Sequence, residues 1–410
     1  MDSWIIALFV IGYLMIIFEH QIGVNKATSA LIMAVGCWAL QFSQAVDPEH
    51  LLGHLAEVSQ VVFFLLGAVT IVETINAHGG FSIIADFLRV SSKKGCLVLV
   101  AILAFFLSAI LDNLTTTIVM IVLLRRLITH THDRLIFGSA IVIAANAGGA
   151  WTPIGDVTTT MLWIGGQVST LPLMQKLFLP SIVSCAVALF FLSFSVSGKI
   201  AKELIERAAV EHKGELVLVA GIASLIFVPV FKMWTGLPPF MGILLSLSFM
   251  WLLTDLLHKT EERNHLRVVS IFPKIDLSAI FFFLGILLAV GALETAGILK
   301  QLAGWFDQHI ASKEVVASLI GVASAIIDNV PLVAATQGMY DLASYPQDHP
   351  FWLLIAFCAG TGGSMLIIGS AAGVAFMSLE KVDFFWYCKK AMLPAAAGYI
   401  AGIATYLCFS

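Results

Sequence analysis

The chain has 410 residues, of which 59% are hydrophobic and 12% are charged, and its formal net charge is −4. Soluble domains carry about 25% charged residues, so this composition excludes a soluble globular protein, and the small net charge gives no sign of a nucleic-acid partner. Apolar stretches of the length that a bilayer requires, roughly 20 residues per helical span, follow one another almost from end to end. The sequence therefore predicts an all-α polytopic membrane protein surrounded by lipid.

In chain order, three spans come first, then a hairpin cut by Asp112 and Asn113, then a helix broken by glycines and polar residues, then a closing span. The second half repeats this order, with Asp328 and Asn329 cutting its hairpin. Irregular backbone survives at membrane depth only where protein or a water-filled cavity surrounds it, so the four interruptions predict an interior site. The predicted elements are spans 4–18, 26–43 and 58–77, hairpin 95–129, broken helix 135–165 and span 172–196, then spans 215–231, 237–257 and 277–297, hairpin 312–341, broken helix 351–380 and span 390–409.

Short sequences recur in the same order and at near-constant spacing in the two halves, which indicates an internal duplication. The predicted units are a first repeat at 1–198, a charged amphipathic cytoplasmic connector at 199–213 and a second repeat at 214–410. The recurring sequences are 63–67 with 281–285, 108–113 with 324–329, and 146–156 with 360–370.

The distribution of basic residues predicts how the repeats cross the membrane. If each hairpin is re-entrant, each repeat has five transmembrane helices, and the second repeat is inverted relative to the first. All lysines and arginines then face one side except Lys176, Lys232, Lys300 and Lys313, as the positive-inside rule requires. Both termini are then periplasmic. Short loops and the lack of a targeting peptide favour a bacterial inner membrane, and 80–94 and 298–313 are either interfacial helices or solvated loops.

Three aspartates, Asp112, Asp156 and Asp328, fall at the interruptions, where an ionised carboxylate costs about 3 kcal/mol on insertion scales. No lysine or arginine adjoins them in the sequence. Each carboxylate must then be neutralised by a proton, by a cation, or by helix N-termini and polar neighbours. The last case, carboxylates that only cap half-helices, is the structural alternative. Ser370 stands where the first repeat has Asp156, so the two repeats are not equivalent.

The residues around these aspartates offer oxygen ligands without sulfur or imidazole, a set that suits alkali and alkaline-earth cations. We predict a Na⁺ site at Asp112, Asn113, Asn146 and Asp156. A proton and the cation compete for this site, so Asp112→Asn should abolish the exchange of one for the other. The remaining predicted ion or proton ligands are Thr158, Thr159, Ser324, Asp328, Asn329, Ser364 and Ser370. Glycines that allow the backbone to unwind there are Gly148, Gly149, Gly155, Gly362, Gly363 and Gly369.

Two further acidic residues, Glu73 and Glu294, lie late in the equivalent third spans, and each is followed by a threonine. They are predicted either to line an ion pathway or to reach the membrane interface.

The chain resembles the NhaD-type Na⁺/H⁺ antiporters of the ion transporter superfamily, which also includes arsenite permeases and citrate transporters. The run from Asn146 to Thr159 carries most of the likeness, followed by the run from Ser108 to Thr116. The resemblance implies exchange of Na⁺ or Li⁺ for H⁺ without a cofactor, an elevator-like movement of the hairpin-bearing part, and a homodimer. It also implies functional polar residues that match Asp112, Asn113, Asn146, Asp156, Thr158, Thr159, Ser324, Asn329 and Ser364.

Three other functions remain as alternatives. A Na⁺- or metal-coupled citrate or dicarboxylate carrier is disfavoured because aspartates at the interruptions repel an anion. An arsenite efflux permease needs no trio of carboxylates, and no cysteine lies at the interruptions. An enzyme would need a nucleophile with its base or a metal-ligand spacing such as HExxH, and neither occurs in the sequence.

Overall fold

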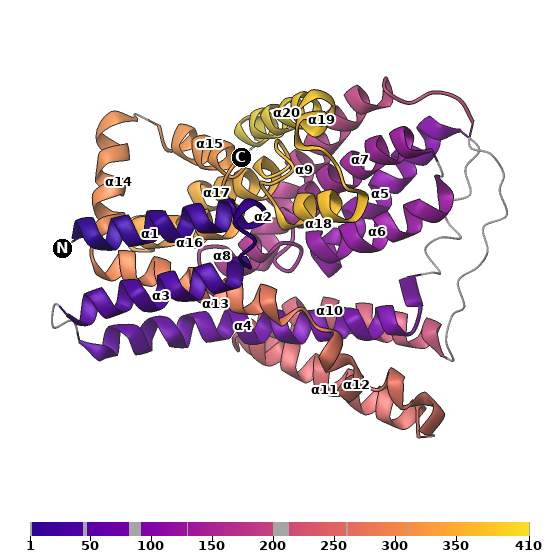
Figure 1. Cartoon of the computed structure of the whole chain (residues 1–410), viewed down its shortest axis with the longest axis horizontal. Helices are drawn as coiled ribbons and strands as arrows, with labels where there is room; N and C mark the ends of the chain where they lie inside the picture. The colour runs from indigo at the N-terminus through magenta and orange to yellow at the C-terminus, as the bar shows by residue number, and fades with distance from the viewer. Residues whose placement is uncertain are drawn as a thin grey trace.

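Figure 1 shows the computed structural model, which describes residues 2–43, 47–81, 92–128, 130–199, 213–259, 261–310 and 312–409. Within these ranges the regular structure is helical, apart from an isolated bridge between Ser92 and Lys199. Several of the helices are long and apolar enough to cross a bilayer, so the protein is a multi-pass membrane protein. Among the described residues, seven helices meet this condition: α4 (Pro48–Ala77), α5 (Lys93–Leu111), α9 (Thr170–Ser193), α10 (Gly214–Thr235), α11 (Pro239–Leu257), α13 (Leu277–Thr295) and the helix Phe384–Phe409, which comprises α19 (Phe384–Tyr387), a π-helical turn (Cys388–Met392) and α20 (Leu393–Phe409).

Four pairs of consecutive helices arise where a polar residue interrupts an apolar stretch. At each interruption a side-chain oxygen accepts a hydrogen bond from a backbone N–H of the second helix, which caps that helix and lets the chain restart after the break. The capping residues are Asp112, Asp156, Asp328 and Ser370. The pairs are α5 with α6 (Asn113–Leu127), α7 (Thr131–Gly149) with α8 (Val157–Ile164), α15 (Lys313–Ala323) with α16 (Asn329–Met339), and α17 (Pro350–Gly362) with α18 (Ala371–Glu380).

The helices form two layers, which Figure 1 shows above and below one another. We call α1 (Asp2–Ile17), α3 (Lys26–Phe42), α4, α10, α11 and α13 the scaffold layer, because these helices pack mainly on one another. We call α5 to α9 and α15 to α20 the site layer. Within the scaffold, Trp38 and Gln41 of α3 donate to the carbonyls of Leu288 and Ala292 on α13, at 2.9 and 2.8 Å.

Inside the site layer, the same contacts occur twice. Ser108 donates to the carbonyl of Ala145 at 2.6 Å, and Ser324 donates to that of Ala359 at 2.9 Å. In each case, the last turns of a first hairpin arm are joined to a broken helix. The second arms cross over: α6 packs against α18, and α16 packs against α8. Each hairpin therefore contacts the broken helices of both halves, and all four interruptions lie close together. The inverted orientation of the two halves remains a prediction.

Some helix boundaries differ from the expected ones. α4 begins at Pro48, ten residues before the predicted span, because Asp47 caps the helix and proline is favourable in its first turn. α5 has 19 residues, which is long enough to cross a bilayer, whereas α15 has 11, so the two hairpins are unequal in length. The segment 298–313 contains the helix α14 (Ile298–His309). Residues 82–91 of the segment 80–94, and residues 200–212 of the connector, lie outside the described residues.

A buried carboxylate joins the two halves at the end of the site layer opposite the hairpin tip. The side chain of Glu380, the last residue of α18, is 1% exposed and accepts from Arg125 at 2.6 Å and from Arg134 at 2.7 Å. Arg125 also donates to the carbonyl of Leu379. These bonds fix the ends of α6 and α7 to α18.

We expect Glu380→Gln to lower the stability of the folded protein by about 2 kcal/mol, because it removes a buried negative charge that accepts from two arginines, of which Arg125 is partly hydrated. The measurement is the midpoint of thermal unfolding in detergent. Glu215→Gln, at an exposed position in the first turn of α10, is the control and should leave the midpoint unchanged. Equal midpoints for Glu380→Gln and the wild type would show that these ion pairs contribute nothing to stability.

Candidate functional site

The carboxylate of Asp156 lies at the centre of the candidate site and is 1% exposed. Thr158 donates to its Oδ1 twice, from the backbone N–H at 2.8 Å and from the hydroxyl at 2.7 Å. Asn113 donates to its Oδ2 at 2.6 Å, and Asn329 lies 3.4 Å from both oxygens. Asn113 and Asn329 are the first residues of α6 and α16, so the tips of both hairpins meet at one carboxylate.

A chain of hydrogen bonds continues from Asn113 into the second broken helix. The amide of Asn113 also lies 2.9 Å from the Oδ1 of Asn146, and the amide of Asn146 donates to the hydroxyls of Ser364 and Ser370, both at 2.9 Å. Each of these side chains is at most 4% exposed. This chain of hydrogen bonds therefore connects three breaks through side-chain oxygens and amides alone: those at 112, 150–156 and 363–370.

Two predicted ligands hold the backbone at the interruptions. The hydroxyl of Thr159 donates to the carbonyl of Asp156 at 2.9 Å, and that of Ser324 donates to the carbonyl of Ala359. Both hydroxyl oxygens keep lone pairs for a cation. Among the described contacts, these two bonds are the only side-chain hydrogen bonds of Thr159 and Ser324.

Asp112 and Asp328 lie apart from this chain of hydrogen bonds. Asp112 accepts from the backbone N–H and the hydroxyl of Thr115, at 2.7 and 2.9 Å, and Asp328 accepts from the backbone N–H of Val330 at 3.2 Å. Each directly precedes an asparagine, Asn113 or Asn329, that contacts Asp156. The structure thus connects Asp156, Asn113 and Asn146 directly, whereas the side-chain hydrogen bonds of Asp112 in the described part of the chain go to Thr115.

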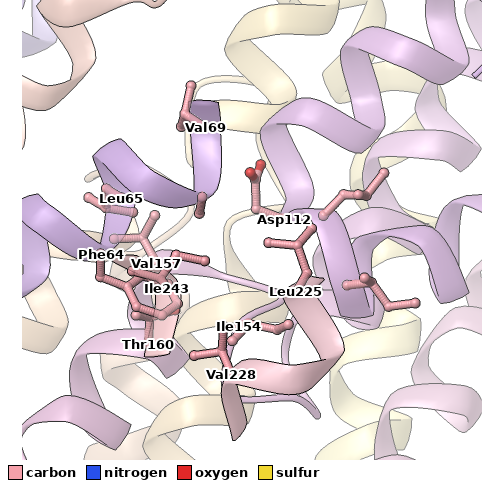
Figure 2. A pocket seen from close by; sticks show the side chains of 13 residues that line it. Phe64, Leu65, Val69, Asp112, Ile154, Val157, Thr160, Leu225, Val228 and Ile243 are labelled. Atoms are coloured by element: carbon pink, nitrogen blue, oxygen red, sulfur yellow. The ribbon is translucent and has the colours of Figure 1, made fainter. Parts of the chain in front are cut away.

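The carboxylate of Asp112 borders a small apolar pocket between the hairpin and the scaffold layer. Figure 2 shows it among Leu65 and Val69 of α4 and Leu225 of α10. The space at the centre is about 20 Å³, which is room for roughly one water molecule. Asp112 also has φ 86° and ψ 162°, a conformation that costs a residue with a Cβ about 1–3 kcal/mol and that is found mainly at functional sites.

All six predicted glycines are buried where two backbone segments touch. A Cβ at any of them would lie within 2.8 Å of a carbonyl oxygen, a distance that no real contact of this kind shows. Gly155 and Gly369 lie inside the breaks, and Gly148, Gly149, Gly362 and Gly363 lie at the ends of α7 and α17. Close approach of the backbone is therefore a second reason for glycine at these positions, beside unwinding.

A polar cavity of about 490 Å³ lies between the two layers, at the C-terminal ends of α8 and α16. Met161 and Ala334 on its wall follow Thr158 and Asn329 by less than two helical turns, so the cavity reaches close to the site. Glu294, one of the two residues predicted to line a pathway or reach the interface, lines this cavity. Glu73 does not line it, and accepts from Asn76 on its own helix at 3.3 Å.

The polar lining of the cavity was not predicted. His54, Glu57, Gln167 and Gln337 lie there together, and Gln337 donates to Gln167 at 2.8 Å. These residues belong to three segments that are far apart in the sequence, and only the packing of α4 and α13 against α8 and α16 shows that they share one space.

Chemically, the site can hold one small cation with oxygen ligands. The carboxylate of Asp156 and the hydroxyls of Thr158, Ser364 and Ser370 would supply part of the coordination, and rotated amides of Asn113 and Asn146 would supply carbonyl oxygens. Without a cation, the amides of Asn113 and Asn329 donate to the carboxylate, so its charge is compensated in both cases.

The sequence of this chain is similar to those of known transporters. The sequence profile of the citrate transporter family (CitMHS) matches residues 13–347. "Sodium/proton antiporter 1" of Arabidopsis thaliana is 55% identical over 99% of this chain and 73% of its own length, and "Sodium/proton antiporter 2" of the same plant is 53% identical over 98% of each. "Na(+)/H(+) antiporter NhaD" of the bacterium Alkalimonas amylolytica is 29% identical over 98% of this chain and 89% of its own length.

Proposed function

The chain belongs to the citrate transporter family, within its NhaD-type sodium/proton antiporters, and on this basis we propose that it exchanges Na⁺ or Li⁺ for H⁺ across its membrane. It is a transporter and not an enzyme. The observation that carries the proposal is the meeting of Asn113 and Asn329, from the two hairpin tips, at the buried carboxylate of Asp156.

The exchange follows from the cost of a bare carboxylate at membrane depth. Asp156 holds either a proton or a cation when the site moves, because an uncompensated charge there is expensive. If the loaded forms move and the empty form does not, each Na⁺ that crosses in one direction is matched by H⁺ in the other. Asp112, one residue before Asn113, adds a second carboxylate that releases a proton as the cation binds and takes one up as the cation leaves.

The movement that we propose is elevator-like, with the site layer sliding against the scaffold layer. The packing supports it: the interruptions and their ligands belong to the site layer, while α3, α4, α10, α11 and α13 pack on one another. In this proposal, the repeats are inverted, the hairpins are re-entrant and the protein is a homodimer. Both termini lie away from the basic loops, on the periplasmic side of a bacterial inner membrane. Because two of the relatives are plant proteins, the localisation of a fluorescent fusion tests which membrane contains this protein.

The test uses purified protein in proteoliposomes that are acidic inside and contain a trapped pH-sensitive dye, with NaCl, LiCl, KCl, citrate or arsenite added outside. We expect the lumen to become alkaline with Na⁺ or Li⁺. Asp112→Asn should abolish the response because an amide cannot take up the proton. Asp276→Asn, which changes an exposed cap at the start of α13, should keep it. Full activity of Asp112→Asn would remove Asp112 from the exchange mechanism.

Citrate is the second candidate, since the family profile carries that name. The buried carboxylate of Asp156, with Asp112 and Asp328 near it, would repel a citrate ion. Accumulation of labelled citrate, with no response to any cation, would replace the proposed function.

A further inference from the structure

Lys232 makes an unusual contact between the two layers. It lies near the end of α10 in the scaffold layer, and its ammonium group donates to the carbonyl of Trp163 at 2.7 Å. The same Nζ lies 4.4 Å from the centre of the Trp163 ring. One lysine thus contacts both the backbone and the side chain of one residue on α8, in the site layer.

The position of Trp163 makes this contact relevant to the ion site. α8 has eight residues: its N-terminal end is capped by Asp156 and carries Thr158, and Trp163 is its second-last residue. The carbonyls at a helix C-terminus carry partial negative charge, which a cation stabilises. An ammonium group at this end holds a short helix whose other end forms the site.

Trp163 is held firmly in place. Its side chain is fully buried, and the ring of Phe64, from α4 of the scaffold layer, packs edge-on against it at 6.4 Å. Its indole N–H makes no hydrogen bond within the described residues, so the carbonyl and the ring face carry its polar contacts. The lysine and Phe64 therefore attach α8 to both α10 and α4.

We propose that Lys232 is a positioning residue: it holds α8, and with it the ion site, in the conformation in which the 490 Å³ cavity is open. Its contact with Trp163 must then be released before the site faces the other side of the membrane. The inference rests on the proposed alternating-access function. The contact biases the balance between two conformations without touching the ion, so it changes the apparent affinity of each side in opposite directions.

The first experiment measures the Na⁺ concentration for half-maximal exchange on each side of oriented vesicles. Removing a charged hydrogen bond and a cation–π contact should shift the conformational balance by at least about tenfold. For Lys232→Met, we therefore expect half-saturation to need more Na⁺ on the cavity side and less on the opposite side. Lys232→Arg keeps the positive charge and an N–H donor that can face the carbonyl and the ring, so its half-saturation values should stay closer to those of the wild type than those of Lys232→Met do. Lys176→Met, at an exposed position on α9, is the control.

A second measurement does not depend on transport. Ala334 lines the cavity, and Ala334→Cys can be labelled with a membrane-impermeant maleimide after Cys388→Ser and Cys408→Ser remove the two cysteines that are not buried. Lys232→Met should slow the labelling several-fold, and Lys232→Arg should not. An unchanged labelling rate, or an equal change in Na⁺ requirement on both sides, would overturn the proposal. Wild-type vesicles without exchange would refute the proposed function, and the labelling result would still decide the role of Lys232.

Discussion

Asp156→Asn is expected to abolish Na⁺-driven proton exchange, with a loss of at least about 100-fold. Asparagine has nearly the same shape and still caps α8 through its side-chain oxygen. It has no charge to balance a cation and cannot carry a proton. It also places an NH₂ group against Asn113 and Asn329, which both donate to Asp156 in the wild type. The measurement is the rate of luminal alkalinisation in proteoliposomes on adding Na⁺.

A matched control separates the loss of charge from the loss of a cap. Asp383 caps α19 by accepting from the backbone N–H of Trp386 at 2.8 Å, and it lies outside the site. Asp383→Asn should therefore keep full exchange and a normal thermal midpoint. If Asp156→Asn retained more than about a tenth of the wild-type rate, with a normal midpoint, the carboxylate would be a helix cap and the exchange site would lie elsewhere.

Gly148→Ala is expected to prevent the site layer from assembling. A Cβ on Gly148 would lie 2.1 Å from the carbonyl oxygen of Phe105 on α5, and neither backbone can move away without separating α5 from α7. Overpacking of a close-packed interior typically costs about 1–3 kcal/mol even when side chains can adjust. Here the clash is with backbone, so we expect a loss above the top of that range, seen as little folded protein in fluorescence size-exclusion chromatography.

Gly362→Ala should behave in the same way, because its Cβ would lie 2.0 Å from the carbonyl oxygen of Gly321 in the second half. Gly304→Ala is the control: Gly304 lies in α14 with open space around it. Alanine there favours the helix by about 0.5–1 kcal/mol. Folded Gly148→Ala protein with a normal thermal midpoint would mean that α5 and α7 are farther apart than the structure shows.

The interruptions were predictable because burying an ionised carboxylate in the apolar interior of a membrane costs free energy, whatever the details of the fold. This rule marked Asp112, Asp156 and Asp328, and the repetition of short sequences marked Ser370 as the counterpart of Asp156. The predicted hairpin at 312–341 contains α15 and α16, which are separated at 324–328. The all-helical, multi-pass character followed from composition alone.

The geometry of the site could not be predicted in the same way. Sequence spacing placed Asp112 and Asp156 in one set of ligands, but it gave no information on the direction of either side chain. In the structure, Asp156 takes the hydrogen bonds of Asn113 and Asn329, while Asp112 borders an apolar pocket. The contact of Lys232 with Trp163 could not be predicted from the sequence either, because the two residues are 69 positions apart and lie on helices that share no sequence pattern.

The crossing of α6 onto α18 and of α16 onto α8 affects how the protein is made. Asp156 contacts Asn329, which follows it by 173 residues in the sequence. Asn146 donates to Ser364 and Ser370, which follow it by 218 and by 224 residues. At synthesis rates of about 5–20 residues per second, the first half waits roughly 10–45 s for these partners. During that time it lies in the membrane with an unfinished polar interior. Quality control of the nascent chain should therefore act on the first half, and truncation anywhere before 370 should leave a fragment that is degraded.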